Sequence, residues 1–282
     1  MNVTVVVPAH DEEAVIGRCL DRLLREAEPG ELRVVVVANG TSDDTLAVAR
    51  TAAGRLGHEI ETIELAEASK IAAVRAGIAR AGGGVVVVDA DVEVSTRSLR
   101  AVAAALDTDR PVVAAPTLVT EAGHASWLVR RYVRAWAALP YVAQSMVGSG
   151  VFGLNPAALE RIGELPDVTN DDGWVRRRFA PHERVVVPEP FVSHAARTVG
   201  ALVRRRARIV NGNRSLDGTL GARDEGRNGM RSLLAAVRRR DVGVVDAGAF
   251  LGVTVAARAV AIRRRISGDA GWYMDTTSRV AA

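Results

Sequence analysis

Two carboxylates stand one residue apart at the end of an apolar segment. Asp89 and Asp91 follow the four consecutive valines Val85–Val88, a short β-branched run that is typical of a buried strand. Two carboxylates this close repel each other unless a cation lies between them or one of them stays protonated. Hard oxygen ligands suit Mg²⁺ or Mn²⁺, and these ions also bridge diphosphates. The motif therefore indicates a divalent cation bound together with a nucleotide diphosphate.

The elements around this motif predict a sheet whose strand ends are polar. Short apolar runs alternate with longer amphipathic segments, as in an α/β fold with a mostly parallel sheet. The predicted strands are 3–7, 34–38, 60–65, 85–89 and 112–116, and the predicted helices are 12–27, 45–56 and 70–81. Ligands of such sheets bind at the carboxyl ends of the strands, so the polar segments 8–13 and 39–44 are expected beside Asp89 and Asp91. Within those segments, Asp11, Asp43 and Asp44 are interpreted as helix caps.

The second half of the chain is less regular. We expect helices at 127–142, 156–162, 199–211 and 242–266, a strand at 183–187, and a loop at 211–229, which is rich in Gly, Asn and Arg. The segment 242–266 is apolar for about the length of a membrane span, but Asp246 and Arg258 lie inside it. It is therefore interpreted as a buried or interfacial helix.

Composition excludes several classes of protein. With 282 residues, 48% of them hydrophobic and 25% charged, the chain can bury a sizeable core and is neither disordered nor collagen-like. The single cysteine, Cys19, cannot form an internal disulfide, and the first residues do not resemble a signal peptide, so a cytoplasmic protein is expected. Sixteen arginines but only five acidic residues lie between Arg197 and Arg265, which predicts an anionic partner for this region.

Lys70 is the only lysine among 37 basic residues. The two basic side chains are not interchangeable at tight sites, so one interpretation is that a compact ammonium is needed at this position. The other is that the lysine has been retained by chance.

Five segments of the chain, in the same order, resemble the glycosyltransferase family 2 members that have a GT-A fold. The segments are VVVPAHDEE, ANGTSDDT, SKIAAVRAGIARA, VVVVDADVEV and GSGVFGLNPAALERIGELPDVTNDDGWVRRRF. The resemblance implies a GT-A, Rossmann-like α/β fold with a mostly parallel central sheet flanked by helices. We expect a glycosyltransferase domain at 1–195, with a nucleotide-sugar-binding half at 1–117 and an acceptor-side half at 118–195. A basic helical extension at 196–282 is expected to pack on it.

The resemblance implies roles for the residues that match the motifs of the family. Glu12 would accept hydrogen bonds from the ribose hydroxyls, and Lys70 would face the nucleotide. The other residues expected to bind the nucleotide-sugar are Pro8, Ala9, His10, Asn39, Asp89, Ala90, Arg205 and Arg208. Many members have an aspartate at the position of Asn39, so the base of the donor stays open. For the two arginines, a solvated basic helix face is the alternative to a clamp on the diphosphate.

The same resemblance implies a metal site. Asp91 would hold a divalent cation, Mn²⁺ or Mg²⁺, while Asp89 would contact the ribose or the metal. His194 lies where members of the family often have a further ligand. An ordinary, partly buried histidine is the alternative for His194.

The acidic pair Asp171 and Asp172 resembles the pair that supplies the base in this family. By register Asp172 is the predicted base, with Asp171 shaping the site or binding the acceptor. A neighbouring carboxylate raises the pKa of one member of the pair, which suits a base acting near neutral pH. Two helix-capping aspartates are the alternative. Trp174 and Trp136 are the predicted acceptor contacts, although aromatic residues in such segments belong equally well to a core.

These expectations together describe a metal-dependent inverting glycosyltransferase. It would transfer sugar from a UDP- or GDP-sugar to a hydroxyl acceptor, either a small molecule or a lipid-linked one. Transfer of a single sugar is expected because the Gln-x-x-Arg-Trp signature of processive members is absent from 204–213. A retaining enzyme and a sugar nucleotidyltransferase are the alternatives. The second is disfavoured because 8–13 contains no glycine for a phosphate loop.

The basic C-terminal third leaves the partner open. A nucleic acid is not expected, because no aromatic residue lies between Phe191 and Phe250 to stack on bases. Contact with anionic lipid at the inner face of the membrane and closure of a homodimer both fit the arginines.

Overall fold

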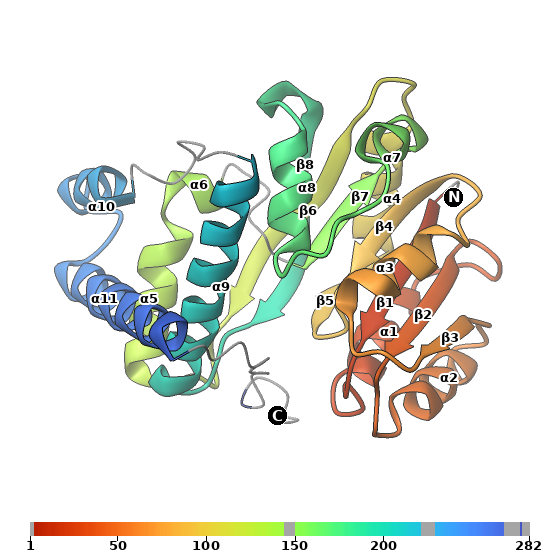
Figure 1. The fold of residues 1–282 in the computed structure, drawn as a ribbon, viewed down its shortest axis with the longest axis horizontal. Coiled ribbons are helices and arrows are strands. Elements are labelled where there is room, and N and C mark those ends of the chain that lie inside the picture. The colour runs from red at the N-terminus through yellow and green to blue at the C-terminus, as the bar shows by residue number, and fades with distance from the viewer. Residues whose placement is uncertain (1–2, 144–149, 221–228, 268–276, 278–282) are drawn as a thin grey trace.

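The computed structural model describes residues 3–143, 150–220, 229–267 and 277, and an eight-stranded sheet runs through its centre (Figure 1). The strand order is β3-β2-β1-β4-β7-β6-β8-β5. The first four of these strands are parallel, and their bounds are β1 Val3–Ala9, β2 Arg33–Asn39, β3 Glu61–Leu65 and β4 Gly84–Val88. This half of the sheet follows the sequence prediction closely, because buried β-branched runs form it.

The other half of the sheet is mixed. Its strands are β5 Val92–Val94, β6 Val113–Glu121, β7 Val151–Leu154 and β8 Arg184–His194. β7 runs antiparallel to both β4 and β6, while β6 and β8 are parallel. The sequence did not predict the short strands β5 and β7, and β8 continues seven residues beyond the predicted strand. Strand β7 is nevertheless the element that joins the two halves of the sheet.

Two layers of helices cover the two faces of the sheet. Alternate valines of β1 divide between them, with Val5 and Val7 on one face and Val6 on the other. The first face is covered by α1 Ile16–Leu24, α2 Thr45–Arg55 and α4 Thr96–Leu106, of which α4 was not predicted. The second face is covered by α3 Lys70–Ile78, α7 Pro156–Ile162 and α8 Asp171–Arg178. A 3₁₀ turn, η1 Pro181–Glu183, leads from α8 into β8.

The remaining helices form a third hydrophobic cluster beside the sheet. They are α5 Trp127–Ala137, α6 Pro140–Ala143, α9 Val199–Leu220, α10 Gly229–Arg238 and α11 Val244–Ile266. Helix α11 packs on α5 and α9 (Figure 1). Its buried Asp246 lies 3.2 Å from the Nη1 atom of Arg131 and 3.5 Å from the Nη2 atom of Arg134. The acidic residue inside this apolar helix is therefore held by arginines of α5.

Two predictions in this region require comment. The predicted loop at 211–229 is wrong for 211–220, which continue α9, and 221–228 lie outside the described residues. The helix continues because its last turns have packing partners: Leu216 is buried in the core of the sheet domain, and Asp217 lies 2.6 Å from Arg177 of α8. Among the described helices, α11 is long and apolar enough to cross a membrane by length and composition. About a third of its most apolar stretch of 18 residues is buried inside the structure.

Candidate active site

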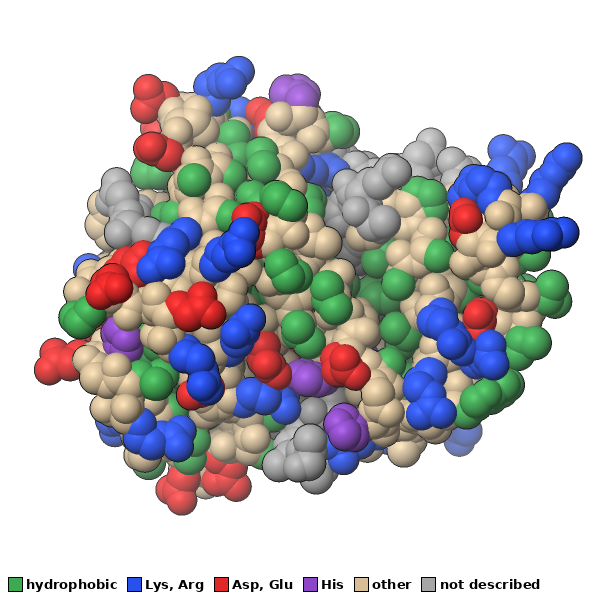
Figure 2. Space-filling view, turned by 180° about the vertical axis from the view of Figure 1, so that it is seen from behind, with side chains coloured by type: hydrophobic (Ala, Val, Ile, Leu, Met, Phe, Trp, Pro, Cys, Tyr) green, Lys and Arg blue, Asp and Glu red, His purple; other side chains and the backbone are tan. Residues whose placement is uncertain are grey.

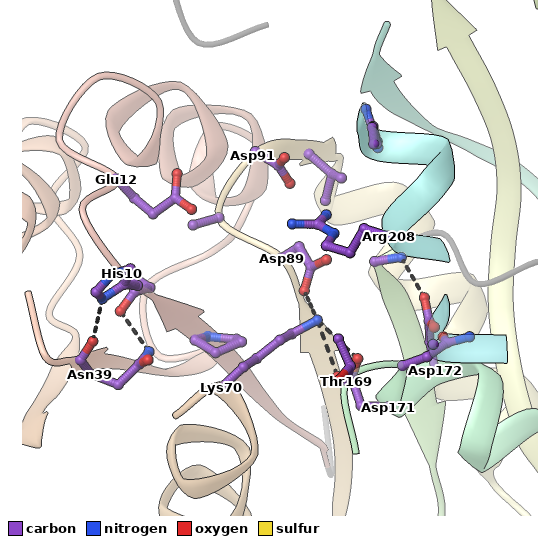
Figure 3. A pocket seen from close by; sticks show the side chains of 18 of the residues that line it. His10, Glu12, Asn39, Lys70, Asp89, Asp91, Thr169, Asp171, Asp172 and Arg208 are labelled. Atoms are coloured by element: carbon purple, nitrogen blue, oxygen red, sulfur yellow. Dashed lines mark hydrogen bonds and ion pairs between the residues drawn. The ribbon is translucent and has the colours of Figure 1, made fainter. Parts of the chain in front are cut away.

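A cavity of about 370 Å³ opens at the carboxyl ends of β1, β2 and β4 (Figure 3). It is lined by most of the residues that the sequence singles out, namely Pro8, Ala9, His10, Glu12, Asn39, Lys70, Asp89, Ala90, Asp91, Asp171, Asp172, Arg205 and Arg208. These residues come from six segments that are distant in sequence. The ends of β1, β2 and β4 and the first residue of α3 place those up to Asp91, and helices α8 and α9 place the other four.

The ends of β1 and β2 are tied together by Asn39 and His10. The Nδ2 atom of Asn39 donates to the carbonyl oxygen of Ala9 at 2.7 Å, and His10 Nδ1 lies 2.7 Å from the carbonyl oxygen of Asn39. An aspartate could not donate the first of these bonds when ionised. This hydrogen bond explains why an asparagine suits position 39 better than an aspartate. The buried Glu12 also lines the cavity.

Lys70 lies between two carboxylates that come from opposite walls of the cavity. Ser69 caps α3 by accepting a hydrogen bond from the backbone of Ala72, which makes Lys70 the first residue of the helix. The Nζ atom of Lys70 lies 2.7 Å from Asp89 Oδ1 and 3.1 Å from each oxygen of Asp171 (Figure 3). A single compact ammonium therefore forms ion pairs with both carboxylates, and a planar guanidinium would not reproduce this geometry.

The charges in this cluster shift its protonation equilibria. Burial alone would lower the pKa of Lys70, but the charges of Asp171, Asp89 and Asp172 together raise it, so the ammonium stays protonated. Burial raises the pKa of Asp89 to about 7; Lys70 opposes that shift, while Asp171 and Asp91 add to it. Burial and the neighbouring carboxylates thus favour the protonated form of Asp89, and the ammonium of Lys70 favours its ionised form.

Asp171 and Asp172 are the first two residues of α8. The helix is capped by Asn170, whose side chain accepts from Gly173 N at 3.1 Å and donates to Asn213 of α9 at 2.7 Å. Both aspartates line the cavity, but Asp171 is 3% exposed and is held by Lys70, whereas Asp172 is only partly buried and accepts hydrogen bonds from the backbone N–H groups of Gly150 and Gly173. Burial, followed by the charge of Asp171, raises the pKa of Asp172, while Lys70 and the two N–H groups oppose the shift. The two aspartates thus have different environments.

Gly150 connects the two acidic groups through its backbone. Its carbonyl oxygen accepts from Asp89 N at 2.8 Å, and its N–H donates to Asp172 Oδ2 at 3.3 Å. It adopts a φ of +86°, and a Cβ atom at this position would stand 2.6 Å from Asp89 Oδ2. Only glycine allows the Asp89 carboxylate to take this position.

Two arginines of α9 complete the wall opposite the strand ends. Arg205 and Arg208 both line the cavity, and Arg205 Nη1 donates to the carbonyl oxygen of His194 at 3.1 Å. Helix α9 also contributes Ile209 and Gly212, one turn further on. The cavity therefore has carboxylates from the end of β4 and the start of α8, and arginines from α9.

His194 does not line this cavity. Its Nε2 atom lies 2.6 Å from Glu93 Oε1, and the same oxygen lies 2.9 Å from Arg18 Nε. Within the described part of the chain, no three His, Cys, Asp or Glu side chains are grouped so as to hold a metal ion. Asp89 and Asp91 still fit a divalent cation, because Mg²⁺-type sites commonly use one or two carboxylates and take other ligands from substrate phosphates and water.

The structure does not bring the two predicted acceptor contacts into the cavity. Trp174 is 5% exposed in the core beneath α8, where its ring lies under the guanidinium of Arg178. Trp136 packs with the third hydrophobic cluster, 5.8 Å from the guanidinium of Arg206. Both rings are used for packing because each lies on the inner side of its helix.

Sequence reasoning missed several lining residues, which are Ala68, Val92, Gly150, Thr169, Asn170, Ile209 and Gly212. Some carried a signal: Asn170 immediately precedes the acidic pair at a helix start, and Gly212 lies one helical turn after Arg208. Gly150 carried none, because its contact with Asp89 depends on the pairing of β4 with β7.

Comparison with solved structures agrees with this architecture. The mannosyltransferase PcManGT from Pyrobaculum calidifontis, solved with GDP-mannose and Mn²⁺, is 21% identical and superimposes with a TM-score of 0.59, over 96% of this chain and 76% of that one. Glucosyl-3-phosphoglycerate synthase from Mycobacterium tuberculosis, solved with Mn²⁺, UDP-glucose and glycerol 3-phosphate, is 21% identical with a TM-score of 0.53, over 79% and 82% of the two chains. At these identities the likeness establishes the GT-A fold.

No curated protein matches the chain in sequence. The family model described as glycosyl transferase family 2, however, matches residues 4–153, which is more than half of the chain and includes β1, Lys70, Asp89 and Asp91. This chain therefore belongs to glycosyl transferase family 2 and is a glycosyltransferase.

Proposed function

We propose that the enzyme transfers one sugar, with inversion, from a nucleotide-diphospho-sugar to a hydroxyl acceptor, with a divalent cation at Asp91 and Asp89 and with Asp172 as the base. The observation that carries this proposal is the placement of two separate carboxylate groups on one cavity. Asp89 and Asp91 lie at the end of β4, and Asp172 lies at the start of α8. An inverting displacement needs such an arrangement, since the leaving group and the attacking hydroxyl lie on opposite sides of the anomeric carbon.

The donor side of the cavity suits a nucleoside diphosphate. Glu12 and the backbone of 8–10 would hold the ribose and base, while Arg205 and Arg208 would bind phosphate oxygens through their guanidinium groups. A divalent cation bound there would neutralise the charge that develops on the diphosphate leaving group. The two solved relatives, which contain GDP-mannose and UDP-glucose with Mn²⁺, are consistent with this class of donor, and the choice between uracil and guanine stays open.

Asp172 is favoured over Asp171 as the base by its surroundings. Asp171 is almost fully buried, and both of its oxygens face the ammonium of Lys70. Asp172 is less buried than Asp171, has a raised pKa, and is oriented by hydrogen bonds from two backbone N–H groups. We assign to Asp172 the removal of the proton from the acceptor hydroxyl, and to Asp171 the positioning of Lys70.

The stereochemistry of the product tests this proposal directly. UDP-glucose and GDP-mannose would each be incubated with enzyme and Mn²⁺, with water as the acceptor, and the released sugar followed by ¹H NMR before mutarotation. Inversion predicts that the first anomer to appear is opposite to that of the donor. Release of the donor's own anomer would instead establish a retaining enzyme and would remove the base role from Asp172.

A further inference from the structure

One exposed stripe of helix α11 is apolar over its whole length. The residues at 245, 248, 252, 255, 259, 262 and 266 recur at alternating steps of three and four, so they share one side of the helix. They are Val245, Gly248, Gly252, Val255, Ala259, Ile262 and Ile266, and all of them are exposed. Val255 and Ile266 are 66% and 83% exposed. From Val255 onward every turn of the stripe presents an exposed apolar side chain, and a contiguous exposed apolar patch marks an interaction surface.

In the C-terminal half of α11 the stripe consists of Val255, Ala259, Ile262 and Ile266, and arginines border it there on both sides. At 100° per residue, Arg258 and Arg265 fall on one border of the stripe and Arg263 falls on the other, and all three are exposed. On the face of the molecule in Figure 2, apolar and basic side chains intermingle over the end that α10 and α11 form, and few carboxylates appear among them. This combination is typical of a helix that lies in the plane of a membrane interface.

The charge of the region decides which occupant fits the stripe. Residues 229–267 contain eight arginines and two acidic residues, Asp241 and Asp246. Asp241 is paired with Arg239, and Asp246 is buried against α5. A second copy of the same surface would therefore bring arginines together with only Asp241, already paired with Arg239, as an exposed carboxylate to meet them, whereas anionic lipid headgroups complement the arginines.

We propose that the C-terminal half of α11 docks the enzyme on the surface of an anionic lipid bilayer, with Val255, Ile262 and Ile266 in the interface and the bordering arginines on lipid phosphates. Helix α9 connects this surface to the cavity. Asn211 Nδ2 donates to the carbonyl oxygen of Ala261 at 3.5 Å, and Arg208 and Gly212, on either side of Asn211, line the cavity. Docking through α11 thus holds the α9 wall of the active site close to the membrane surface.

Vesicle flotation tests the proposal independently of catalysis. The full-length protein is mixed with vesicles of phosphatidylcholine alone and with vesicles that also contain about 30% phosphatidylglycerol, at low and at high salt. The protein is expected to float with the anionic vesicles at low salt and to remain behind with the neutral ones. The triple variant Arg258→Glu, Arg263→Glu, Arg265→Glu is expected to weaken binding by at least about tenfold, and Ile262→Asn with Ile266→Asn by several-fold.

Matched control variants show whether vesicle binding depends on this surface of α11 or only on the net charge of the protein. Arg55→Glu, Arg97→Glu, Arg110→Glu makes the same change at exposed positions outside the α10–α11 region, and Val119→Asn removes an exposed apolar side chain from β6. Both controls are expected to bind like the unmodified protein. Equal loss in both triple variants, equal binding to neutral vesicles, or no binding at all would overturn the proposal. So would a dimer, detected by light scattering, that Ile262→Asn converts to monomer while vesicle binding is absent.

Discussion

The ammonium of Lys70 lies 3.1 Å from the carboxylate of Asp171, and this ion pair joins the first turn of α3 to the first turn of α8. The same ammonium holds Asp89 at the end of β4. A single side chain therefore links the sheet edge, where the donor is expected, to the acidic pair of α8. The only lysine of the chain stands at the point where the two walls of the cavity meet.

Removal of the lysine is expected to leave two partly desolvated carboxylates without their cation. Lys70→Met should lower the free energy of unfolding by about 2 kcal/mol at pH 8, as is typical when one partner of a buried pair is lost. Because the carboxylates can then take up protons as the pH falls, the loss should shrink at pH 5. Urea unfolding of both proteins at the two pH values measures this difference. Arg161→Met, which breaks the more exposed pair with Glu183, serves as control and should change stability little at either pH. A Lys70→Met loss that is equal at both pH values would contradict the account.

Gly150 is expected to tolerate no side chain. Gly150→Ala places a Cβ atom against Asp89 Oδ2 and adds strain at a positive φ, so it should cost roughly 1–3 kcal/mol of stability and should also weaken metal-dependent nucleotide binding. Gly163→Ala is the matched control, because Gly163 also has a positive φ but its Cβ would meet no atom within 4 Å. The control should lose stability only. Nucleotide titrations that show equal affinity for the two variants would refute the role of Gly150 in placing Asp89.

The two aspartates of α8 should respond differently to neutralisation. Asp172→Asn should lower kcat by two or more orders of magnitude while nucleotide binding changes little, the scale expected when a general base is lost. Asp171→Asn should have the smaller effect on kcat. Steady-state kinetics with parallel calorimetric titration of the nucleotide would measure both quantities. A larger kcat loss in Asp171→Asn would move the base role to that residue.

The pH dependence of the reaction should report the same pair. A base must be deprotonated, so kcat is expected to rise with pH through the pKa of Asp172, which burial and the charge of Asp171 hold above its ordinary value. In Asp171→Asn the neighbouring negative charge is absent while Lys70 remains, so this pKa should fall and the acid limb should move to lower pH. A profile of kcat against pH for the two proteins checks the direction. An acid limb that stays in place or moves upward would show that another group titrates.

Most of the residues that line the cavity could be singled out from the sequence, because the positions of strand ends follow from a simple rule. Asp89, Asp91 and Asn39 lie within three residues of the end of a run of buried valines, and parallel strands bring such ends to one edge. The antiparallel insertion was harder to predict. β7 is four residues long and contains Gly153, which has low strand propensity but lies so close to α4 that a Cβ would stand 2.8 Å from Leu106 Cδ1.

Side-chain roles that depend on tertiary packing could not be predicted in the same way. An aromatic residue beside an acidic pair suggests a substrate contact, yet Trp174 is buried in the core beneath α8, while Asp171 and Asp172 line the cavity. The glycines and asparagines of 211–220 suggest a loop, but contacts from Asn213 and Leu216 to α8 and the core stabilise the helix. Local propensity was outweighed by packing in both cases.

Metal-dependent nucleotide binding tests the central claim most directly. UDP and GDP would each be titrated calorimetrically into the protein and into Asp91→Ala, with and without Mn²⁺. We predict micromolar binding of one nucleotide by the unmodified protein, lost when Mn²⁺ is omitted and lost in Asp91→Ala. Failure of both nucleotides to bind, or binding that depends neither on Mn²⁺ nor on Asp91, would contradict the assignment of the cavity as a metal-dependent nucleotide-sugar site.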